Sequence, residues 1–399
     1  MNIVIAHFNS CYVRMPGGVE KVTCNLANAM TARGHSVTIL YRESKEGHAY
    51  FPLDARVPEH NILYDDHGNY IIQDKLPNSI RLKREFFRLF APSKAHDINA
   101  VAKGKSYGPS IRKWLDRLQP DVIVSTSMPS TKYVVEDAAA AAPVITMIHS
   151  QPSVQFKAIA PAERRAVSRC AGIQILLPSG MEVTRQYFPD LPVHVIGNAV
   201  EVPAWVADLA REKTRYKIVC VGTINPNKNQ KLAVDAFAGL AERFPQWDME
   251  LWGLNHGSYP DMLTSHIKKL HLEDRVFIKG LTKNVADDIY KKADLFVIPS
   301  KREGFPLSLT EAMAAGFPAI GLRTCPGVNE LIRDEETGFL VDETVSAMAD
   351  AMARLMADRG LRIRMGTAGR EAVKIYEADK IWDQWETLLA KTAAESRKE

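Results

Sequence analysis

The feature that most constrains the fold is an alternation of short apolar runs with amphipathic segments, which occurs twice along the 399 residues. In the first half, runs rich in Val and Ile predict buried strands at 2–7, 36–41, 121–125, 143–148 and 172–177. An amphipathic helical pattern at 19–33 stops at Gly34, a residue that suits the end of a helix. Strands alternating with helices predict a parallel sheet covered by helices on both faces.

The alternation restarts after a segment that contains proline and then many charges, as is typical of a linker. In the second half, predicted strands lie at 216–222, 249–253, 275–278, 294–299 and 318–322, and predicted helices at 230–243, 259–270, 284–292 and 306–315. The sequence therefore predicts an α/β protein with two doubly wound, Rossmann-like domains that face each other across a cleft.

The expected domain boundaries follow from this rhythm. They give an N-terminal domain at 1–199, a linker at 200–215 and a C-terminal domain at 216–379. A last helical pattern within 380–399 is expected to return to the N-terminal domain, and its polar tail from Thr392 is expected to fray. Ligands of such sheets bind beyond the carboxyl ends of the strands, so the loops that follow the strands are the expected binding regions.

Composition and charge exclude several other classes of protein. The longest uncharged apolar stretch, 138–148, is too short to span a bilayer. The five cysteines lack metal or redox spacing and the N-terminus lacks a basic leader, which predicts a cytoplasmic protein. The first 199 residues hold 23 Lys and Arg against 17 Asp and Glu. This balance suits an anionic partner but falls short of a nucleic-acid-binding footprint, so no nucleic acid is expected.

The most informative motif follows the fourth strand predicted in the second half. Gly304 permits a tight turn there, and Pro306 suits the first position of the helix that comes next. The free amides of Gly304, Phe305 and Leu307, together with the helix dipole, predict an anion site suited to a diphosphate.

Two carboxylates flank this turn. Glu303 precedes the predicted helix, and Glu311 lies about one and a half turns into it. Carboxylates so placed can accept hydrogen bonds from sugar hydroxyls, one on a hexose and one on a ribose. The alternative is a solvated helix start whose acidic residues have no role. The strand, glycine, proline and helix in sequence favour a site more than the spacing of the two acids does.

Two further loops carry candidate phosphate contacts, each after the first strand of its half. Lys228 can counter the charge of a diphosphate leaving group, unless it is a surface lysine without a role. Gly17 and Gly18 let the backbone approach a ligand closely, and the helix that follows favours phosphate. A glycine turn without a ligand is the alternative for this second loop.

Together these motifs resemble the family-four retaining glycosyltransferases (glycosyl transferases group 1, GT-B fold). The signature of that family is two glutamates separated by seven residues inside an E-G-F-P-type segment, which Glu303 and Glu311 match. The resemblance implies that Glu303 contacts the donor hexose and Glu311 the ribose. The run at 17–21 is similar to the family's G-G-x-E-[RK] run.

Two other positions follow from the resemblance. The family usually has Gly-Arg, four residues and then Lys; Lys228 matches, but Thr223 occupies the arginine position. One of two expected cations is therefore missing, and Lys228 should carry more of the charge unless Lys231 or Arg302 compensates. His149 matches the family's histidine at the end of the fourth strand, which implies contact with the donor sugar or stabilisation of charge at the anomeric carbon. A packed, structural histidine is the alternative.

The resemblance implies transfer of a hexose or N-acetylhexosamine, with retention, from a nucleotide-diphosphate sugar to a glycan or lipid-linked acceptor of bacterial surface polysaccharide or lipopolysaccharide synthesis. A UDP-sugar is favoured as donor by family habit. No Asp-x-Asp pair occurs in the sequence, so a metal-independent reaction without a further cofactor is expected. The expected catalytic residues are His149, Lys228 and Glu303; the expected donor-binding residues are Gly17, Gly18, Thr223, Lys228, Glu303, Gly304, Phe305, Pro306, Leu307 and Glu311.

Two rival interpretations stay open. A nucleotide-sugar epimerase could use the same two-domain plan, and a non-catalytic subunit could bind a sugar nucleotide. The second rival is suggested by Thr223, which replaces the family arginine.

One basic stretch, 79–105, raises the question of a membrane. Leu82, Phe86, Leu89 and Phe90 share one face of a predicted helix, and arginines lie on another. Such a helix can make a peripheral contact with an anionic membrane or a lipid diphosphate. It can equally pack its apolar face into the core and leave the basic face in solvent.

Overall fold

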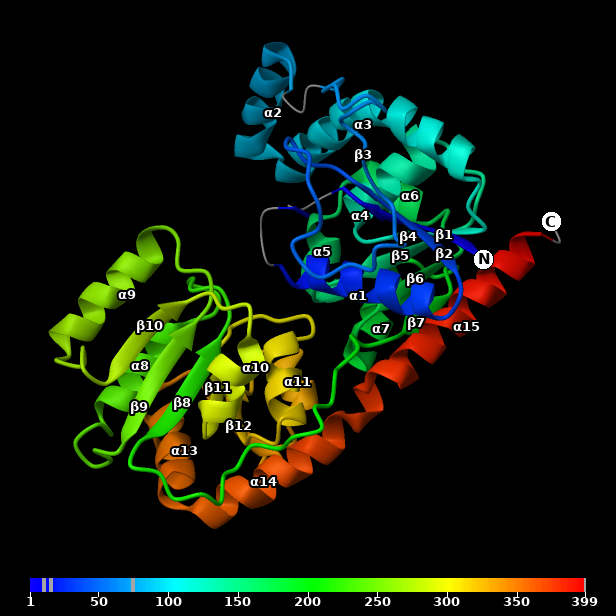
Figure 1. The fold of residues 1–399 in the computed structure, drawn as a ribbon. Helices are drawn as coiled ribbons and strands as arrows, with labels where there is room; N and C mark the ends of the chain where they lie inside the picture. The colour runs from blue at the N-terminus through cyan, green and yellow to red at the C-terminus, as the bar shows by residue number, and fades with distance from the viewer. Residues whose placement is uncertain (9–11, 14–16, 73–75, 398–399) are drawn as a thin grey trace. The chain divides into compact units, whose positions relative to one another are not determined.

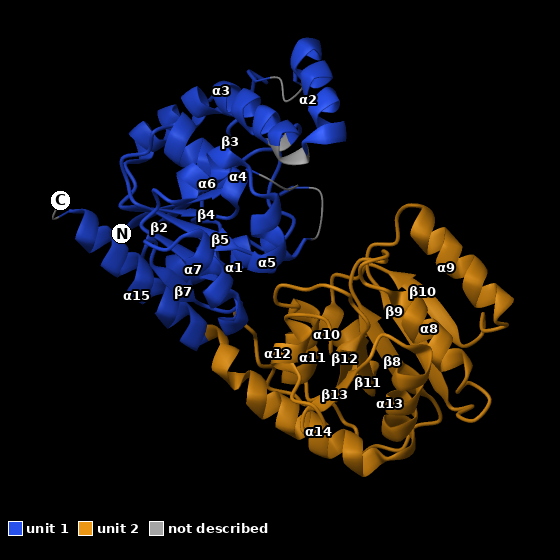
Figure 2. Cartoon of the chain, turned by 180° about the vertical axis from the view of Figure 1, so that it is seen from behind, with its two compact units in different colours: residues 1–198, 379–399 blue, residues 199–378 orange. Residues whose placement is uncertain are grey.

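A computed structural model describes residues 1–8, 12–13, 17–72 and 76–397. The chain divides into two compact units, Met1–Asn198 with Asp379–Glu399, and Ala199–Ala378 (Figure 2). Each unit is built on one parallel β-sheet with helices on its faces, labelled in Figure 1. This is the doubly wound, Rossmann-like α/β class that the alternating pattern predicts.

The first unit contains a sheet of seven strands in the order β3-β2-β1-β4-β5-β6-β7, all parallel. The strands are β1 Asn2–His7, β2 Ser36–Tyr41, β3 Glu59–Asn61, β4 Val122–Ser125, β5 Val144–Ile148, β6 Gly172–Ile175 and β7 Val193–Val195. The order reverses between β1 and β4, and the carboxyl ends of neighbouring strands at such a switch point form a binding edge.

The helices of the first unit follow the sheet strands in sequence. They are α1 Gly18–Ala32, α2 Asn78–Phe90, α3 Pro92–Leu118, α4 Met128–Lys132, α5 Pro152–Gln155, α6 Pro161–Val167, α7 Met181–Tyr187 and the terminal α15 Ala378–Ser396, with a π-helix at Tyr133–Asp137 and 3-10 turns at Phe156–Ala158 and Pro178–Gly180. The central strands are fully buried between them; Ile3, Val4, Ile5 and Ala6 of β1 have no exposed surface. Burial on both faces is what the uninterrupted apolar runs predict.

Helix α15 is longer than its sequence pattern suggests. It continues to Ser396, and Thr392 and Ala393 are buried. The tail expected to fray from Thr392 is therefore helical as far as Ser396, because the buried Thr392 and Ala393 side chains hold it in place. The helix is tied to the loop after α1 by a hydrogen bond between His35 Nε2 and Glu386 Oε1 at 2.7 Å.

The second unit contains a sheet of six strands in the order β10-β9-β8-β11-β12-β13, all parallel. The strands are β8 Tyr216–Val221, β9 Trp247–Trp252, β10 Val276–Gly280, β11 Leu295–Ile298, β12 Ala319–Leu322 and β13 Gly338–Val341. The helices are α8 Gln230–Ala238, α9 Ser258–Lys269, α10 Val285–Asp288, α11 Leu307–Ala314, α12 Val328–Leu331, α13 Val345–Ala357 and α14 Arg359–Ala372, with 3-10 turns at Tyr290–Lys292 and Val373–Tyr376. The helix predicted at 230–243 thus ends early, and the one predicted at 284–292 is broken in two.

The segment predicted as a linker, 200–215, has neither helix nor strand but is fastened to the second unit. The guanidinium of Arg370 donates to the backbone oxygens of Pro203, Trp205 and Ala314. The amide of Ala207 donates to the oxygen of Ala315 at 2.8 Å. These bonds hold the segment against α11 and α14.

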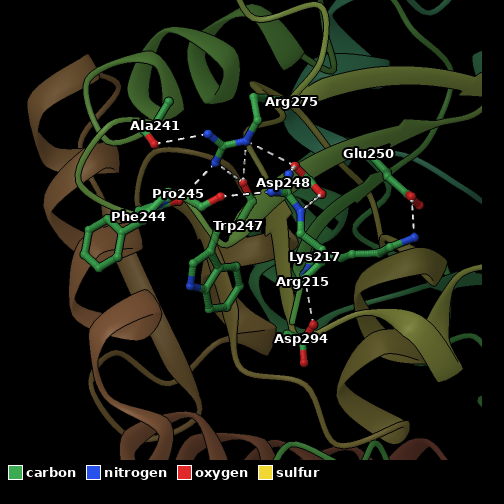
Figure 3. A network of polar contacts seen from close by, with 10 residues as sticks. All are labelled: Arg215, Lys217, Ala241, Phe244, Pro245, Trp247, Asp248, Glu250, Arg275 and Asp294. Carbon is green, nitrogen blue, oxygen red and sulfur yellow. Dashed lines mark hydrogen bonds and ion pairs between the residues drawn. The ribbon is translucent and has the colours of Figure 1, made fainter. Parts of the chain in front are cut away.

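A polar network closes the amino ends of the strands in the second unit (Figure 3). The Asp248 carboxylate accepts from Arg215 Nε at 2.8 Å and from Arg275 Nε at 3.2 Å. Arg275 also donates to the oxygens of Ala241 and Phe244, which fixes the turn between α8 and β9. Because this network lies at the amino ends, the opposite edge of the sheet remains for the site.

Candidate functional site

The candidate site of the second unit lies in the loops after β8, β11 and β12. These strands pair in the sheet, β8 with β11 and β11 with β12, so the loops beyond their carboxyl ends are neighbours. The structure thus brings together the two sequence motifs at 221–229 and 299–316. Asn227 joins them, since its oxygen accepts from the Lys301 amide at 2.8 Å and its Nδ2 donates to the Arg302 oxygen at 3.0 Å.

The central contact of this site is an ion pair between Lys228 and Glu303. Lys228 Nζ lies 2.6 Å from Glu303 Oε1, and the side chains are 23% and 12% exposed. The turn that carries Lys228 is fixed by Asn225, whose Oδ1 accepts from the amides of Asn227 and Lys228 at 3.0 and 2.9 Å. Because the pair is little exposed to water, the attraction between the Lys228 ammonium and an anion that reaches it is only weakly screened.

The amides expected to bind an anion are open. Among the described residues, the amides of Gly304, Phe305 and Leu307 donate no hydrogen bond, whereas those of Leu309 and Thr310 donate to the Pro306 oxygen. Pro306 caps α11 rather than occupying its first position, which is a shift of one residue from the prediction. The open amides and the N-terminus of α11 together favour a negative charge at this place.

Glu311 lies one turn further along α11 and is held by a residue that the sequence did not reveal. The Tyr290 hydroxyl donates to Glu311 Oε2 at 3.3 Å and to the Ser308 oxygen at 3.1 Å. Burial, and then the Glu311 charge, raise the pKa of the Tyr290 phenol well above its usual value. The phenol therefore keeps its proton and orients the carboxylate.

Gly327 is a second residue missed by sequence reasoning. Its φ is +82°, and a Cβ there would lie 2.8 Å from the Gly304 oxygen and 3.0 Å from the Glu303 oxygen. Only glycine permits both this backbone conformation and this close approach. The available signal was the Cys-Pro-Gly run after the strand predicted at 318–322. Gly327 therefore supports the backbone of the Glu303–Gly304 turn from behind.

Thr223 is exposed, and its side chain brings no charge to the site. Of the two cations expected to compensate, Lys231 is engaged, since its Nζ lies 2.6 Å from Asp235 Oδ2 on the same helix. The Arg302 side chain is exposed and has no partner among the described residues. Of these two cations, Arg302 is therefore the one that no described carboxylate already engages.

The first unit holds the remaining predicted residues around the carboxyl ends of β1, β4 and β5. His7 Nδ1 lies 3.0 Å from Thr126 Oγ1, and His7 Nε2 lies 3.4 Å from Glu20 Oε1. A Cβ on Gly17 would overlap the Glu20 carboxylate, so a larger residue there would require the Glu20 side chain to move. Met15 and Pro16, from the same motif, lie outside the described residues. His7 and Glu20 were not among the predicted site residues; the position of His7 at the end of a predicted strand was the available signal.

His149 follows β5 in this cluster. Its Nε2 is buried and has no hydrogen-bond partner in the described structure. Burial, and then the neighbouring His7, lower the pKa of His149 to about 4. The imidazole is therefore neutral at physiological pH and retains an unused hydrogen-bonding atom.

The described residues do not support a metal site, a cysteine nucleophile or a membrane-spanning helix. No three His, Cys, Asp or Glu side chains in them are placed to share a metal ion. Burial raises the pKa of the Cys24, Cys220 and Cys325 thiols to about 12, which makes these thiols poor nucleophiles. None of the described helices is long and apolar enough to cross a membrane.

Comparison of the sequence with models of known protein families identifies the family of this chain. Residues 16–202 match "Glycosyltransferase Family 4", and residues 201–372 match "Glycosyl transferases group 1". The two matches meet where the first compact unit ends and together cover most of the chain. The chain belongs to the family-four glycosyltransferases. The resemblance inferred from the motifs is thereby confirmed, and the enzyme is a retaining hexosyltransferase.

Two curated relatives show how far the similarity extends. The glycosyltransferase is 23% identical over 387 residues to an uncharacterized glycosyltransferase of Haemophilus influenzae, a match that covers 94% of this chain and 96% of the relative. It is 34% identical over 157 residues to the lipopolysaccharide core biosynthesis mannosyltransferase LpsB of Rhizobium meliloti, covering 38% of this chain and 44% of the relative.

A solved structure supports the fold of the glycosyltransferase. TarM of S. aureus, in complex with fondaparinux, alpha-GlcNAc-glycerol and UDP, is 15% identical, with a TM-score of 0.73 over 97% of this chain and 99% of that one. At this identity the similarity concerns the fold alone. It confirms the GT-B class expected from the sequence.

Proposed function

We propose that this glycosyltransferase moves a hexose or N-acetylhexosamine from a nucleotide-diphosphate sugar, with UDP-sugars favoured, to a glycan or lipid-linked acceptor. The product belongs to a bacterial surface polysaccharide or lipopolysaccharide, and the enzyme works from the cytoplasm without a metal ion. The observation that carries the proposal is the Lys228–Glu303 ion pair beside the open amides at the start of α11.

The diphosphate is the part of the donor that this arrangement suits best. The amides of Gly304, Phe305 and Leu307 and the N-terminus of α11 offer oriented donors, and Lys228 supplies a full positive charge. Arg302 supplies a second cation in place of the one missing at Thr223. As the bond to the sugar breaks, negative charge grows on the leaving phosphate, and preorganised donors stabilise it there.

The two carboxylates are assigned to bind the transferred sugar and the ribose of the donor. When Lys228 turns to the diphosphate, Glu303 accepts hydrogen bonds from hydroxyls of the transferred sugar. Glu311, oriented by Tyr290, accepts from the ribose hydroxyls. Both contacts position the anomeric carbon rather than perform acid–base chemistry.

His149 is assigned to the donor sugar from the first unit. A neutral imidazole can hydrogen-bond a sugar hydroxyl through the Nε2 atom that is now buried and unpaired. It also tolerates positive charge at the anomeric carbon better than an imidazolium does, because like charges repel. Acceptor attack on the same face, with the departing phosphate taking the acceptor proton, then gives retention.

The choice of donor and acceptor rests on the comparisons. TarM is recorded with UDP, which favours a UDP-sugar, and LpsB builds a lipopolysaccharide core, which favours a surface-glycan acceptor. The Gly17–Gly18 turn at the start of α1 is assigned to the same substrates as a place of close backbone approach.

A donor screen tests the proposal. Purified enzyme is supplied with a panel of UDP- and GDP-sugars and mixed acceptors, and the release of UDP or GDP is followed. We expect release that depends on an acceptor and is lost in Lys228→Ala and Glu311→Ala. Full activity in both variants would overturn the assigned site.

The same screen separates the rival interpretations. An epimerase releases UDP without any acceptor and inverts the sugar at carbon 2. A non-catalytic subunit binds UDP in calorimetry but turns over no donor in the panel.

A further inference from the structure

Helix α2 exposes a continuous apolar face to solvent. Leu82, Phe86, Leu89 and Phe90 are between 62% and 78% exposed, and the helix contains no buried residue. Their spacing places all four side chains on one face of about 100°. The core-packed alternative considered for this segment is therefore wrong, because its large apolar side chains do not enter the core.

The opposite face of α2 attaches the helix to its own unit. Ile80, Arg84 and Phe87 are partly buried, and the ammonium of Lys94 on α3 lies 4.5 Å from the centre of the Phe87 ring. Figure 1 shows α2 beside the start of α3 at the periphery of the first unit. The helix is thus held by one face while the apolar face points away.

The polar side of α2 is mainly basic. Lys83 borders the exposed apolar face on one side and Glu85 on the other, and Arg81 and Arg88 lie further round the helix beyond Glu85, all four exposed. Glu85 is the only acidic residue of the helix, and it is paired with Arg84 and Arg88. Four basic residues against one acidic residue leave α2 with a net charge of +3.

This combination favours a lipid surface over a protein partner. Protein interfaces are depleted in lysine at their core, whereas interfacial helices combine a Leu- and Phe-rich face with a basic polar face. The thirteen residues span about 20 Å, too short to cross a bilayer but long enough to lie in its surface. Long basic side chains on the polar side can extend back toward lipid phosphates while the apolar face enters the membrane.

We propose that α2 binds the surface of an anionic phospholipid bilayer, inserting Leu82, Phe86, Leu89 and Phe90 between the lipids while Arg81, Lys83 and Arg88 contact their phosphates. The proposal is independent of the glycosyl transfer assigned above, because it concerns a different surface and a different ligand. Its test therefore needs neither donor nor acceptor.

The test is co-sedimentation of the full chain with vesicles. Vesicles contain either phosphatidylcholine alone or phosphatidylcholine with phosphatidylglycerol, at low salt. We expect binding to the anionic vesicles only, weakened as salt increases. Each basic residue near an anionic surface adds to the free energy of membrane binding. Arg81→Gln should therefore lower the partition coefficient by about fivefold.

The apolar contribution is tested with Leu82→Ser/Phe86→Ser, which we expect to lower the partition coefficient by at least about tenfold. Met262→Ser/Ile363→Ser is the matched control, because it removes exposed apolar side chains from α9 and α14. The control should bind as the unaltered protein does. Circular dichroism confirms that both variants stay folded.

Three outcomes would overturn the proposal. One is equal binding of the unaltered protein to both kinds of vesicle or to neither, and another is unchanged binding of Leu82→Ser/Phe86→Ser. The third concerns a second copy of the chain: if sedimentation velocity shows a dimer that Leu82→Ser/Phe86→Ser dissociates, and vesicles are not bound, the apolar face serves self-association instead.

Discussion

The ammonium of Lys228 lies 2.6 Å from the carboxylate of Glu303, although the two residues are 75 positions apart in the chain. Each neutralises the other in the enzyme without its substrate. A diphosphate offers Lys228 a partner with more negative charge, and a sugar offers Glu303 hydroxyl donors. The pair therefore holds both side chains in place before the donor arrives, at little cost in reorganisation.

Removing the charge of Lys228 should mainly affect turnover. We expect Lys228→Gln to lower kcat by about 100- to 1,000-fold, because a preorganised donor to the leaving group is lost. Lys231→Gln is the matched control, since Lys231 is occupied by Asp235 on α8, and it should stay within about twofold. Steady-state rates of nucleotide release measure both. Equal losses in the two variants would remove Lys228 from its proposed role.

Gly327 should be needed for the shape of the Glu303 turn. Gly327→Ala forces a side chain into a left-handed backbone conformation and against the Glu303 and Gly304 oxygens, which should cost about 1–3 kcal/mol of unfolding free energy. Gly280→Ala is the control, because Gly280 has a similar φ of +80° but no atom within 4 Å of the added Cβ. Urea unfolding and UDP calorimetry compare them. The site assignment predicts that only Gly327→Ala weakens UDP binding beyond its effect on stability.

His149 should make the fold sensitive to acid. Its pKa is lowered to about 4 in the folded protein, against 6.5 for a free histidine. Between these values the unfolded chain binds the proton more readily, so this group lowers the unfolding free energy as pH falls from 6.5 towards 4. His149→Asn should lose that part of the pH dependence.

Urea unfolding at pH 7 and at pH 5 measures the His149 effect. The difference between the two pH values should be smaller in His149→Asn than in the unaltered protein. An identical difference in both would mean that His149 is accessible to protons in the fold. Transfer activity, by contrast, should show no titration of His149 between pH 6 and 8.

Asp248 should matter for stability and not for catalysis. Its carboxylate is buried and accepts from Arg215 and Arg275 at the amino ends of the strands (Figure 3). Asp248→Asn leaves two guanidinium groups with a weaker partner, which should lower the unfolding free energy by about 2 kcal/mol. Asp261→Asn on the exposed surface of α9 is the control. A large loss of kcat in folded Asp248→Asn would contradict this separation.

Most of the fold could be predicted because the central strands are buried on both faces and read as apolar runs. The three strands that were missed, β3, β7 and β13, lie at sheet edges and have only three or four residues each, too short to stand out as apolar runs. The sequence predicted the separate motifs of the site, because each motif directly follows a predicted strand. Tyr290 and Gly327 were missed because their roles depend on contacts with Glu311 and Glu303 that only the folded chain creates.

Helix α2 shows a different limit of sequence reasoning. Its amphipathic pattern is the same whether Leu82 and Phe86 face the protein core or a lipid surface. Only the exposure of these side chains in the folded chain separates the two cases. Likewise, the sequence could name Lys231 and Arg302 as substitutes for the missing arginine, but not show that Lys231 is already bound to Asp235.

The place of α15 has a consequence for the order in which the chain can fold during synthesis. The first unit is discontinuous, because Ile381, Trp382 and Trp385 of α15 complete its packing after the whole of Ala199–Ala378 has been made. The second unit is contiguous, and Val200 and Glu377 close it through the bonds from the Val200 amide to the Tyr376 oxygen and from the Ala378 amide to the Val200 oxygen. On the ribosome, the later-encoded unit can thus mature while the earlier one still waits for its last helix.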